Sequence, residues 1–248
     1  MRYSEQPAGD PPVEAQVEFW NRWNREAREE RPPDRPTLRR QQEVLAALQR
    51  AGIRSARILE VGCGTGWLSA RLLDHGEVTA TDLAGQIVER ARCSFPDVHF
   101  LTGDFMTLDA GTGYDVVVCL ETLSHVVDQR AFVARLASCL RPGGMLVLTT
   151  QNRFVLERRD DVMPPGPGQV RRWLNRRELA SLMAPDFRIL RLASLEPAGH
   201  GGVLRLVNSS KLTRPLVAVL GRDRMRRWKE AAGLGQTRLV VAEKQRTA

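Results

Sequence analysis

An acidic residue followed by three alternating glycines marks the stretch LEVGCGTGW at residues 59–67. These four residues are Glu60, Gly62, Gly64 and Gly66. A glycine-rich turn between a strand and a helix lets the backbone come close to a ligand. A dinucleotide loop of the GxGxxG type would need its third glycine where this chain has Trp67, and the lysine of a phosphate-binding P-loop is missing. The turn therefore favours a ligand without a pyrophosphate.

Two further carboxylates follow the next two predicted strands. Asp82 ends the stretch EVTATD, about 20 residues after the glycine turn, where a carboxylate can accept both hydroxyls of a ribose. Asp104 lies in the stretch GDF after the third strand, where it can accept a hydrogen bond from an adenine amino group. Ligands of open α/β sheets bind at the carboxyl ends of the strands. The three features together indicate a nucleoside without phosphate, such as S-adenosylmethionine.

These residues must be positioned by an alternation of strands and helices. We expect strands at 56–61, 77–82, 98–104, 114–120, 143–151, 187–195 and 237–244. We expect helices at 13–30, 38–52, 67–73, 84–95, 129–140, 175–184 and 214–232. Such alternation predicts an α/β fold with a mostly parallel sheet and helices on both faces. The last strand follows a long insertion, which favours an antiparallel pair at the sheet edge.

The sequence resembles the Rossmann-like (class I) S-adenosylmethionine-dependent methyltransferases, and within them the quinone-biosynthesis and small-molecule group. The resemblance rests on the pieces LEVGCGTGW, VTATDLA, LTGDF, YDVVVCLETLSHVVD and LRPGGMLVLTT, which span about residues 56–150 in the family's order and spacing. It implies a seven-stranded Rossmann-like sheet with an antiparallel last strand, an N-terminal helical lid and a helical insertion before that strand.

The resemblance also implies which residues bind the cofactor. They are Glu60, Gly62, Gly64, Gly66, Asp82, Leu83, Asp104, Phe105 and Leu120. The glycines would pass under the methionine part, and Glu60 would hold the turn and the amino end of the ligand. Asp82 would take the ribose hydroxyls, Leu83 would lie against the adenine, and Asp104 with the backbone of Phe105 would contact the adenine edge. The backbone near Leu120 would meet the amino acid end.

Two histidines are candidates for proton transfer. Methyl transfer from a sulfonium is an in-line displacement, so an enzyme mainly aligns the reactants and needs a base only where the acceptor must lose a proton. His125 follows the fourth strand, on the side that faces the methyl group in the family, and histidine titrates near neutrality. Its alternative role is to cap or pack the site. His200, in the stretch PAGHGG, is the second candidate, with a surface loop as its alternative.

The acceptor side is less constrained by the sequence. Trp20 and Trp23 lie on the first helix, which often closes over the cofactor in this family, although core packing is an equal alternative. Asn152 and Arg153 follow the fifth strand and are expected to face the acceptor. Aromatic residues with arginines nearby hint at an apolar acceptor that carries an acidic group.

No metal is expected. The segment at Glu121 resembles the E-x-x-E-H motif that holds a divalent ion in the quinone-biosynthesis O-methyltransferases. Here Ser124 replaces the second acid, so one hard oxygen ligand is lost. Glu121, His125 and Asp128 would remain as weak ligands at most.

The net charge of +8, from 37 basic and 29 acidic residues, raises the alternative of a nucleic-acid partner. The arginines are scattered and often lie beside acids, and the segment after the fourth strand reads LETLSH rather than a base-stacking Asn/Asp-Pro-Pro-aromatic motif. We therefore expect methylation of an oxygen or nitrogen on a small molecule, in natural-product, sugar or quinone-type metabolism, and no nucleic-acid partner. RNA or protein methylation is the alternative, and a non-catalytic binding protein is a second one.

The chain is expected to form a single domain over residues 1–248. We expect residues 1–12 to be disordered, 13–55 to form a helical cap, 56–195 with 237–244 to form the core, and 196–236 to form a lid. The four cysteines form no CxxC pair, which indicates reduced thiols. A polar N-terminus and the lack of a long apolar run indicate a cytoplasmic protein without a membrane span. We expect the protein to be a monomer or a homodimer.

Overall fold

The computed structural model describes most of the chain. The described residues are 9–27, 31–199, 201, 202, 204, 205, 209, 214, 217, 218 and 221–246. His200 lies outside them, as do positions 1–8 of the segment expected to be disordered. None of the helices in this described part is both long and apolar enough to cross a membrane.

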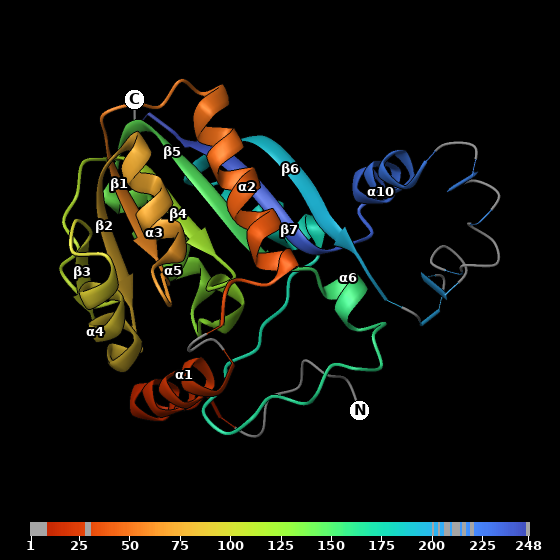
Figure 1. Ribbon diagram of the computed structural model, residues 1–248, viewed down its shortest axis with the longest axis horizontal. Helices are drawn as coiled ribbons and strands as arrows, with labels where there is room; N and C mark the ends of the chain where they lie inside the picture. The colour runs from red at the N-terminus through yellow and green to blue at the C-terminus, as the bar shows by residue number, and fades with distance from the viewer. Residues whose placement is uncertain are drawn as a thin grey trace.

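A seven-stranded sheet forms the centre of the described structure (Figure 1). Its strands are β1 Ala56–Val61, β2 Gly76–Asp82, β3 His99–Thr102, β4 Tyr114–Leu120, β5 Leu140–Gln151, β6 Phe187–Pro197 and β7 Gly235–Lys244. Their order is β3-β2-β1-β4-β5-β7-β6, with β1 to β5 parallel and β7 antiparallel to both of its neighbours. The predicted Rossmann-like sheet with an antiparallel last strand is confirmed.

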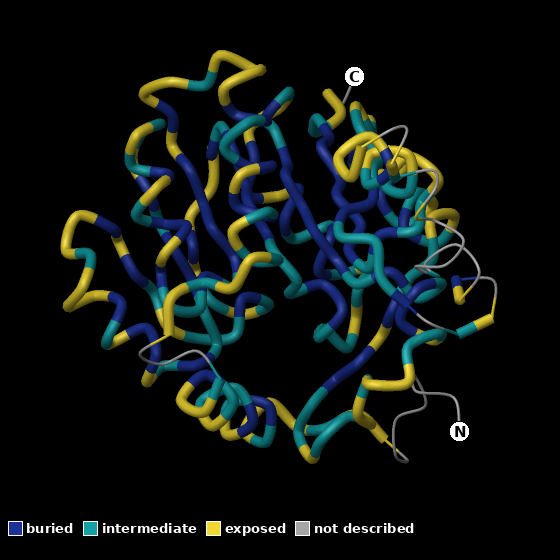
Figure 2. Tube along the Cα trace, turned by 45° about the vertical axis from the view of Figure 1, so that its right-hand side comes forward, coloured by how far each residue is buried: buried dark blue, intermediate teal, exposed yellow. Residues whose placement is uncertain are grey.

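Helices cover both faces of this sheet. They are α1 Val13–Ala27, α2 Arg35–Arg50, α3 Trp67–Leu72, α4 Gly85–Ser94, α5 Gln129–Cys139, α6 Arg153–Leu156, α7 Arg176–Met183 and α10 Arg222–Ala231, with short 3-10 turns η1 Leu73–His75 and η2 Leu123–His125. Successive side chains of a strand point to opposite faces. In β1, Ile58 therefore packs with α2, α3 and α4, whereas Leu59 packs with α5 and α7. Figure 2 shows the central strands buried and the outer surfaces of the helices exposed.

Two helix starts differ from the sequence prediction. The second helix was expected at 38–52, but α2 already begins at Arg35. The Asp34 side chain caps it by accepting a hydrogen bond from Thr37 N at 2.9 Å, and a proline occupies the first turn. The helix expected at 214–232 is resolved as α10, which begins only after Gly221, whose φ is 80°.

The described part of the 196–236 insertion lies mainly beside the sheet edge. Helix α10 packs on β6, where the Ser194 hydroxyl donates to the Glu230 carbonyl at 2.6 Å. Residues 196–199 line a small hollow of about 500 Å³ with Arg159 and Gln236. The main cavity is instead covered by α1 and by the segment 159–173.

Candidate active site

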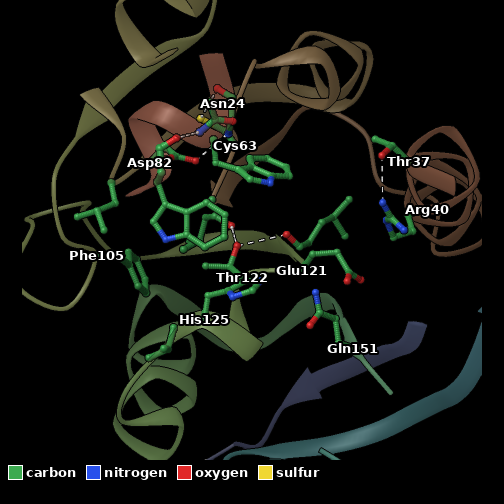
Figure 3. Close-up of a pocket in the computed structure, with 18 of the residues that line it drawn as sticks. Asn24, Thr37, Arg40, Cys63, Asp82, Phe105, Glu121, Thr122, His125 and Gln151 are labelled. Atoms are coloured by element: carbon green, nitrogen blue, oxygen red, sulfur yellow. Dashed lines mark hydrogen bonds between the residues drawn. The ribbon is translucent and has the colours of Figure 1, made fainter. Parts of the chain in front are cut away.

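A cavity of about 780 Å³ opens at the carboxyl ends of β1, β2 and β4. Its walls come from the glycine turn, the first two helices, the segment 159–173 and the start of β7. This size lies within the range of small-molecule sites. Figure 3 shows Asp82 and Phe105 at one end, and Glu121, Gln151 and Arg40 at the other.

The glycine turn has a backbone that other residues rarely adopt. Gly62, Gly64 and Gly66 have φ values of 80°, 54° and 76°, all in the left-handed region. Gly62 N donates to Thr81 O at 2.8 Å, and a Cβ on Gly62 would lie 2.0 Å from Thr122 Oγ1. Around Gly64 a Cβ would meet no atom within 4 Å, so this glycine faces open space in the cavity. The turn is therefore fixed on one side and open toward a ligand on the other.

Asp82 connects the glycine turn to the end of β2. Its Oδ2 accepts a hydrogen bond from Gly64 N at 2.8 Å, and its Oδ1 accepts one from Ala84 N at 2.9 Å. Burial raises the pKa of this carboxyl, and these backbone donors oppose the rise. Each carboxylate oxygen has a second lone pair, so ribose hydroxyls can still bind there. The ribose role of Asp82 remains a prediction that this geometry supports.

Glu60 lies beneath the turn and is almost fully buried. The Ser69 hydroxyl donates to Glu60 Oε2 at 2.5 Å. Burial, with a smaller contribution from Asp82, raises the pKa of Glu60 to about 8. Two buried acids on one wall favour a cationic ligand, because a nearby positive charge offsets the desolvation of a carboxylate. The residues present thus fit the sulfonium and ammonium groups of S-adenosylmethionine.

The predicted adenine contacts meet at the same end of the cavity. Leu83, Asp104 and Phe105 all line it. Asp104 Oδ1 accepts a hydrogen bond from Met106 N at 2.9 Å, and the Phe105 ring contacts Phe132 edge-on at 5.5 Å between centroids. Leu120 also lines the cavity, and its carbonyl accepts a hydrogen bond from the Thr122 hydroxyl at 3.2 Å.

His125 lines the cavity from η2, and Val170 fixes its ring. Its Nδ1 lies 2.8 Å from the Val170 carbonyl oxygen. A carbonyl can only accept, so Nδ1 carries the proton and, in the neutral ring, Nε2 has the free lone pair. Burial, together with the nearby Arg171, lowers the pKa of His125 to about 4, against the hydrogen bond to Val170. His125 is therefore neutral at physiological pH and can accept a proton at Nε2.

Of the two predicted lid tryptophans, Trp20 contacts this histidine and Trp23 contacts Trp20. The Trp20 ring meets His125 edge-on at 4.7 Å and Trp23 at 5.6 Å between ring centroids. Both tryptophans line the cavity. Helix α1 therefore contributes aromatic side chains to the cavity wall beside His125.

Asn152 and Arg153 are placed elsewhere than predicted. Neither lines the cavity. Asn152 is fully buried and donates from Nδ2 to the carbonyls of Gly233 and Gly235, at 3.2 and 2.6 Å. Arg153 forms an ion pair with Glu178 at 2.7 Å. Both residues connect β5 to neighbouring segments, which is a structural role.

Several lining residues were not singled out from the sequence as acceptor contacts. They are Thr37, Arg40, Gln41, Glu121, Gln151, Arg159, Gln169, Arg171, Trp173, Gln236 and Thr237. Gln151 ends β5 and Glu121 follows β4 directly, and this position at the carboxyl edge of the sheet is a signal that the sequence offered. The others come from segments whose place at the cavity depends on the tertiary fold. Among the described residues, no three His, Cys, Asp or Glu side chains are grouped as metal ligands.

The fold and this cavity define a class I, Rossmann-like domain of the S-adenosylmethionine-dependent methyltransferases. Residues 58–144 match the family described as "Methyltransferase domain". They include the glycine turn, the ends of β2 and β3, and η2. The chain thus contains a class I methyltransferase domain.

Curated relatives match over part of the chain. A ubiquinone biosynthesis O-methyltransferase of Xanthomonas axonopodis pv. citri is 39% identical over 117 residues, which cover 44% of this chain and 48% of that protein. The corresponding protein of Xanthomonas oryzae pv. oryzae is 43% identical over 117 residues, with the same coverage. The chain spans about half the length of the curated relatives it matches.

Solved structures share the fold at low sequence identity. The N-methyltransferase NodS of Bradyrhizobium japonicum WM9, solved with S-adenosylhomocysteine, has a TM-score of 0.62 and 16% identity, covering 94% of this chain and 100% of that one. Magnesium protoporphyrin IX methyltransferase of Synechocystis PCC 6803 has a TM-score of 0.60 and 18% identity, with coverage of 92% and 95%. A 4+2 cyclase, SpnF, has a TM-score of 0.61 and 17% identity, with coverage of 96% and 100%. These likenesses concern the fold.

Proposed function

We propose that this protein transfers a methyl group from S-adenosylmethionine to an oxygen or nitrogen of a small-molecule acceptor. The observation that carries the proposal is that one cavity contains both parts of a methyltransferase site. The glycine turn, Asp82 and Asp104 line one end, and a polar chamber with Trp20 and Trp23 on its wall forms the other. His125 lies on the wall of this cavity. A cofactor at the glycine turn and an acceptor in the chamber would therefore share one enclosed space.

The cofactor, when bound, supplies a methyl group activated by a sulfonium. The protein's own residues orient and desolvate the reactants, and such alignment is worth up to roughly 7–11 kcal/mol of the barrier. Trp20 and Trp23 exclude water from above. His125 holds its proton at Nδ1 through Val170 and offers Nε2 to an acceptor that must lose a proton.

The experiment for the cofactor half is a calorimetric titration with S-adenosylmethionine and S-adenosylhomocysteine, paired with a thermal-shift measurement. We expect saturable heat and an increase in Tm with both compounds. No heat and no shift would refute the proposal. Methyl transfer itself is then tested by incubating the protein with labelled cofactor and a metabolite extract, and following the label by mass.

The acceptor is not carried over from the relatives. The ubiquinone biosynthesis O-methyltransferases match over 117 residues, and the family match covers residues 58–144, which excludes α1, α2 and the segment 159–173. A quinone-type phenol is one candidate acceptor, and an amine or sugar hydroxyl is another. Because a cyclase shares this fold, the labelling experiment has a further outcome: the protein binds the cofactor but transfers no labelled methyl group.

RNA or protein methylation is the second candidate, favoured by the net charge of +8. Binding to RNA would be tight at low salt and would weaken steeply as salt rises, because counterions are released from the phosphates. A filter-binding titration at two salt concentrations distinguishes this candidate from a small-molecule enzyme.

A further inference from the structure

Glu121, the first residue after β4, has an unusual backbone for its type. Its φ is 58°, a left-handed conformation that residues with a Cβ rarely adopt. The conformation is held by its own N–H, which donates to Thr149 O at 3.0 Å and lies 3.2 Å from Thr149 Oγ1. Strain of this kind persists where the surroundings impose it and clusters at functional sites.

The carboxyl group of Glu121 lines the cavity and is not fully satisfied. Within the described part of the chain, its Oε1 is buried and has no hydrogen-bond partner. Burial raises the pKa of Glu121, against the opposing influence of Arg40 and of the hydroxyls of Thr149 and Thr237. Leaving a buried acceptor without a donor is unfavourable, because the oxygen has lost its water and gained no partner.

Arg40, the cation whose charge acts on the Glu121 carboxyl, already forms an ion pair with another residue. Arg40 Nη1 lies 3.2 Å from Glu196 Oε2, and the same oxygen accepts from Gln236 Nε2 at 3.1 Å. Arg40 also donates to the Thr37 hydroxyl at 3.0 Å. Among the described residues, Glu121 is in no ion pair, whereas Glu196 is. This end of the cavity therefore presents an unmatched acceptor.

We propose that Glu121 is the residue that binds the methyl acceptor, and that the acceptor presents to it an O–H or N–H donor next to the group that is methylated. The proposal deepens the proposed function and rests on it, because it takes the chamber beyond the cofactor end as the acceptor site. Glu121 follows β4 directly, His125 ends η2 four residues later, and both side chains line the same cavity, so a ligand in that cavity has access to the carboxylate and to the imidazole.

The chemistry that this carboxylate recognises is a hydroxyl or amine. The sequence analysis took the arginines as an indication of an acidic acceptor. Two of the arginines that line the cavity, Arg40 and Arg159, already form ion pairs with Glu196 and Asp161. An acceptor with a carboxylate at Glu121 would place two like charges together in a desolvated space. We expect such molecules to be excluded there.

The test uses three matched probes, benzylamine, benzyl alcohol and benzoate, titrated by ligand-observed NMR into the protein saturated with S-adenosylhomocysteine. We expect benzylamine and benzyl alcohol to bind more tightly than benzoate. In Glu121→Gln, we expect benzylamine to bind about tenfold or more weakly, the size of effect typical for a hydrogen bond to a charged group. The control Glu243→Gln changes a carboxyl that pairs with Arg188 and does not line the cavity, and should leave all three unchanged.

Stability separates a binding role from a structural one. Replacing a residue that stabilises the fold lowers Tm. Glu121→Gly instead removes two unfavourable features, the unsatisfied carboxyl and the Cβ in a strained backbone conformation. We expect Glu121→Gly to fold with an unchanged or higher Tm and to lose the preference for benzylamine. A lower Tm in both variants with the preference retained would overturn the proposal.

The remaining outcomes are also decisive. Binding of benzoate at least as tight as that of the other two, or no binding by the donor probes, would overturn the role of Glu121. Heat from S-adenosylhomocysteine in the same protein shows that such a failure concerns Glu121 alone. Absent heat, with probe binding that still depends on Glu121, would refute the proposed cofactor and leave the carboxylate as a ligand site.

Discussion

The two ends of the cavity differ in whether backbone or side chains form their walls. At the cofactor end, the shape comes from the backbone: three glycines with positive φ, and N–H groups of Gly64 and Ala84 that bind Asp82. At the end proposed to bind the acceptor, called the acceptor end from here on, the shape comes from side chains on α1, α2, the segment 159–173 and the start of β7. The first end is continuous with the sheet, whereas the second is assembled from segments far apart in sequence.

The difference also appears in how far the carboxylates are satisfied. Both oxygens of Asp82 and one oxygen of Glu60 accept hydrogen bonds within the protein. At the other end, Glu121 Oε1 has no partner among the described residues. A preformed end suits a ligand that every member of a class shares. An unsatisfied end suits a ligand that completes the site, so we expect the side chains at this end to determine which acceptor binds.

The largest expected effect would disrupt the backbone end. Gly62→Ala places a Cβ 2.0 Å from Thr122 Oγ1 at a φ of 80°, so strain and overpacking together should lower the free energy of unfolding by about 3–5 kcal/mol. Chemical denaturation measures it. Gly64→Ala is the matched control: its Cβ would meet no protein atom, so we expect about 1 kcal/mol of destabilisation together with a clear loss of cofactor affinity. Equal destabilisation of the two variants would contradict the proposed asymmetry of the turn.

Glu60 gives the cofactor end a pH dependence. Burial raises its pKa from 4.5 to about 8 in the fold, so between these values the unfolded chain loses the proton while the folded one keeps it. Stability therefore falls as pH rises through this window and levels off above it. At about 1.4 kcal/mol per unit, the loss from pH 4.5 to 7 is on the order of 3 kcal/mol. Denaturation of Glu60→Gln should show this part of the pH dependence removed, and an unaltered profile would count against a buried neutral Glu60.

Asp82→Ala tests the polar part of the same end. It removes the acceptor of two backbone N–H groups and the predicted partner of the ribose hydroxyls. We expect the affinity for S-adenosylhomocysteine to fall about 100-fold, near 2.7 kcal/mol, which is the upper range for a hydrogen bond to a charged group. Calorimetry measures this. Asn175→Ala, which removes the cap of α7 at a residue that does not line the cavity, serves as a control for general helix loss, and an equal effect on affinity there would undermine the assignment.

The sequence predicted the glycine turn on the cavity wall, because a positive φ and a close approach demand glycine and leave a visible pattern, while the binding of the cofactor by these residues stays a prediction. The ends of β2 and β3 also placed Asp82 and Asp104 on the cavity wall. The acceptor end could not be predicted in the same way. The contact of His125 with Val170 joins residues 45 apart, and that of Arg40 with Glu196 joins residues 156 apart.

Asn152 shows the limit of reasoning from strand ends alone. Its position after β5 predicted a side chain that faces the acceptor. The structure turns it toward the carbonyls of Gly233 and Gly235, which arrive with the antiparallel strand β7. The register of β7 depends on how it pairs with β5 and β6, and nothing near Asn152 in the sequence encodes that pairing.

The smallest expected effect lies where the two ends meet, at His125. Because its pKa is lowered to about 4, the ring is neutral between pH 5 and 8, and protonation of His125 should cause no loss of turnover across that range. A base with so low a pKa is a weak one, so we expect His125→Ala to lower turnover only about tenfold, with affinity for S-adenosylhomocysteine nearly unchanged. Kinetics with an acceptor found by the mass-label screen measure both.

His125→Asn separates proton transfer from positioning. Its amide can still donate to the Val170 carbonyl, but it offers no basic nitrogen where the Nε2 of the imidazole was. Turnover restored by asparagine would mean that His125 acts by holding the 159–173 segment and Trp20 in place. Turnover that stays low in both variants, while cofactor affinity is preserved, would assign the proton to Nε2. His125 would then act on the acceptor, although η2, which carries it, follows shortly after β4 at the carboxyl edge of the sheet.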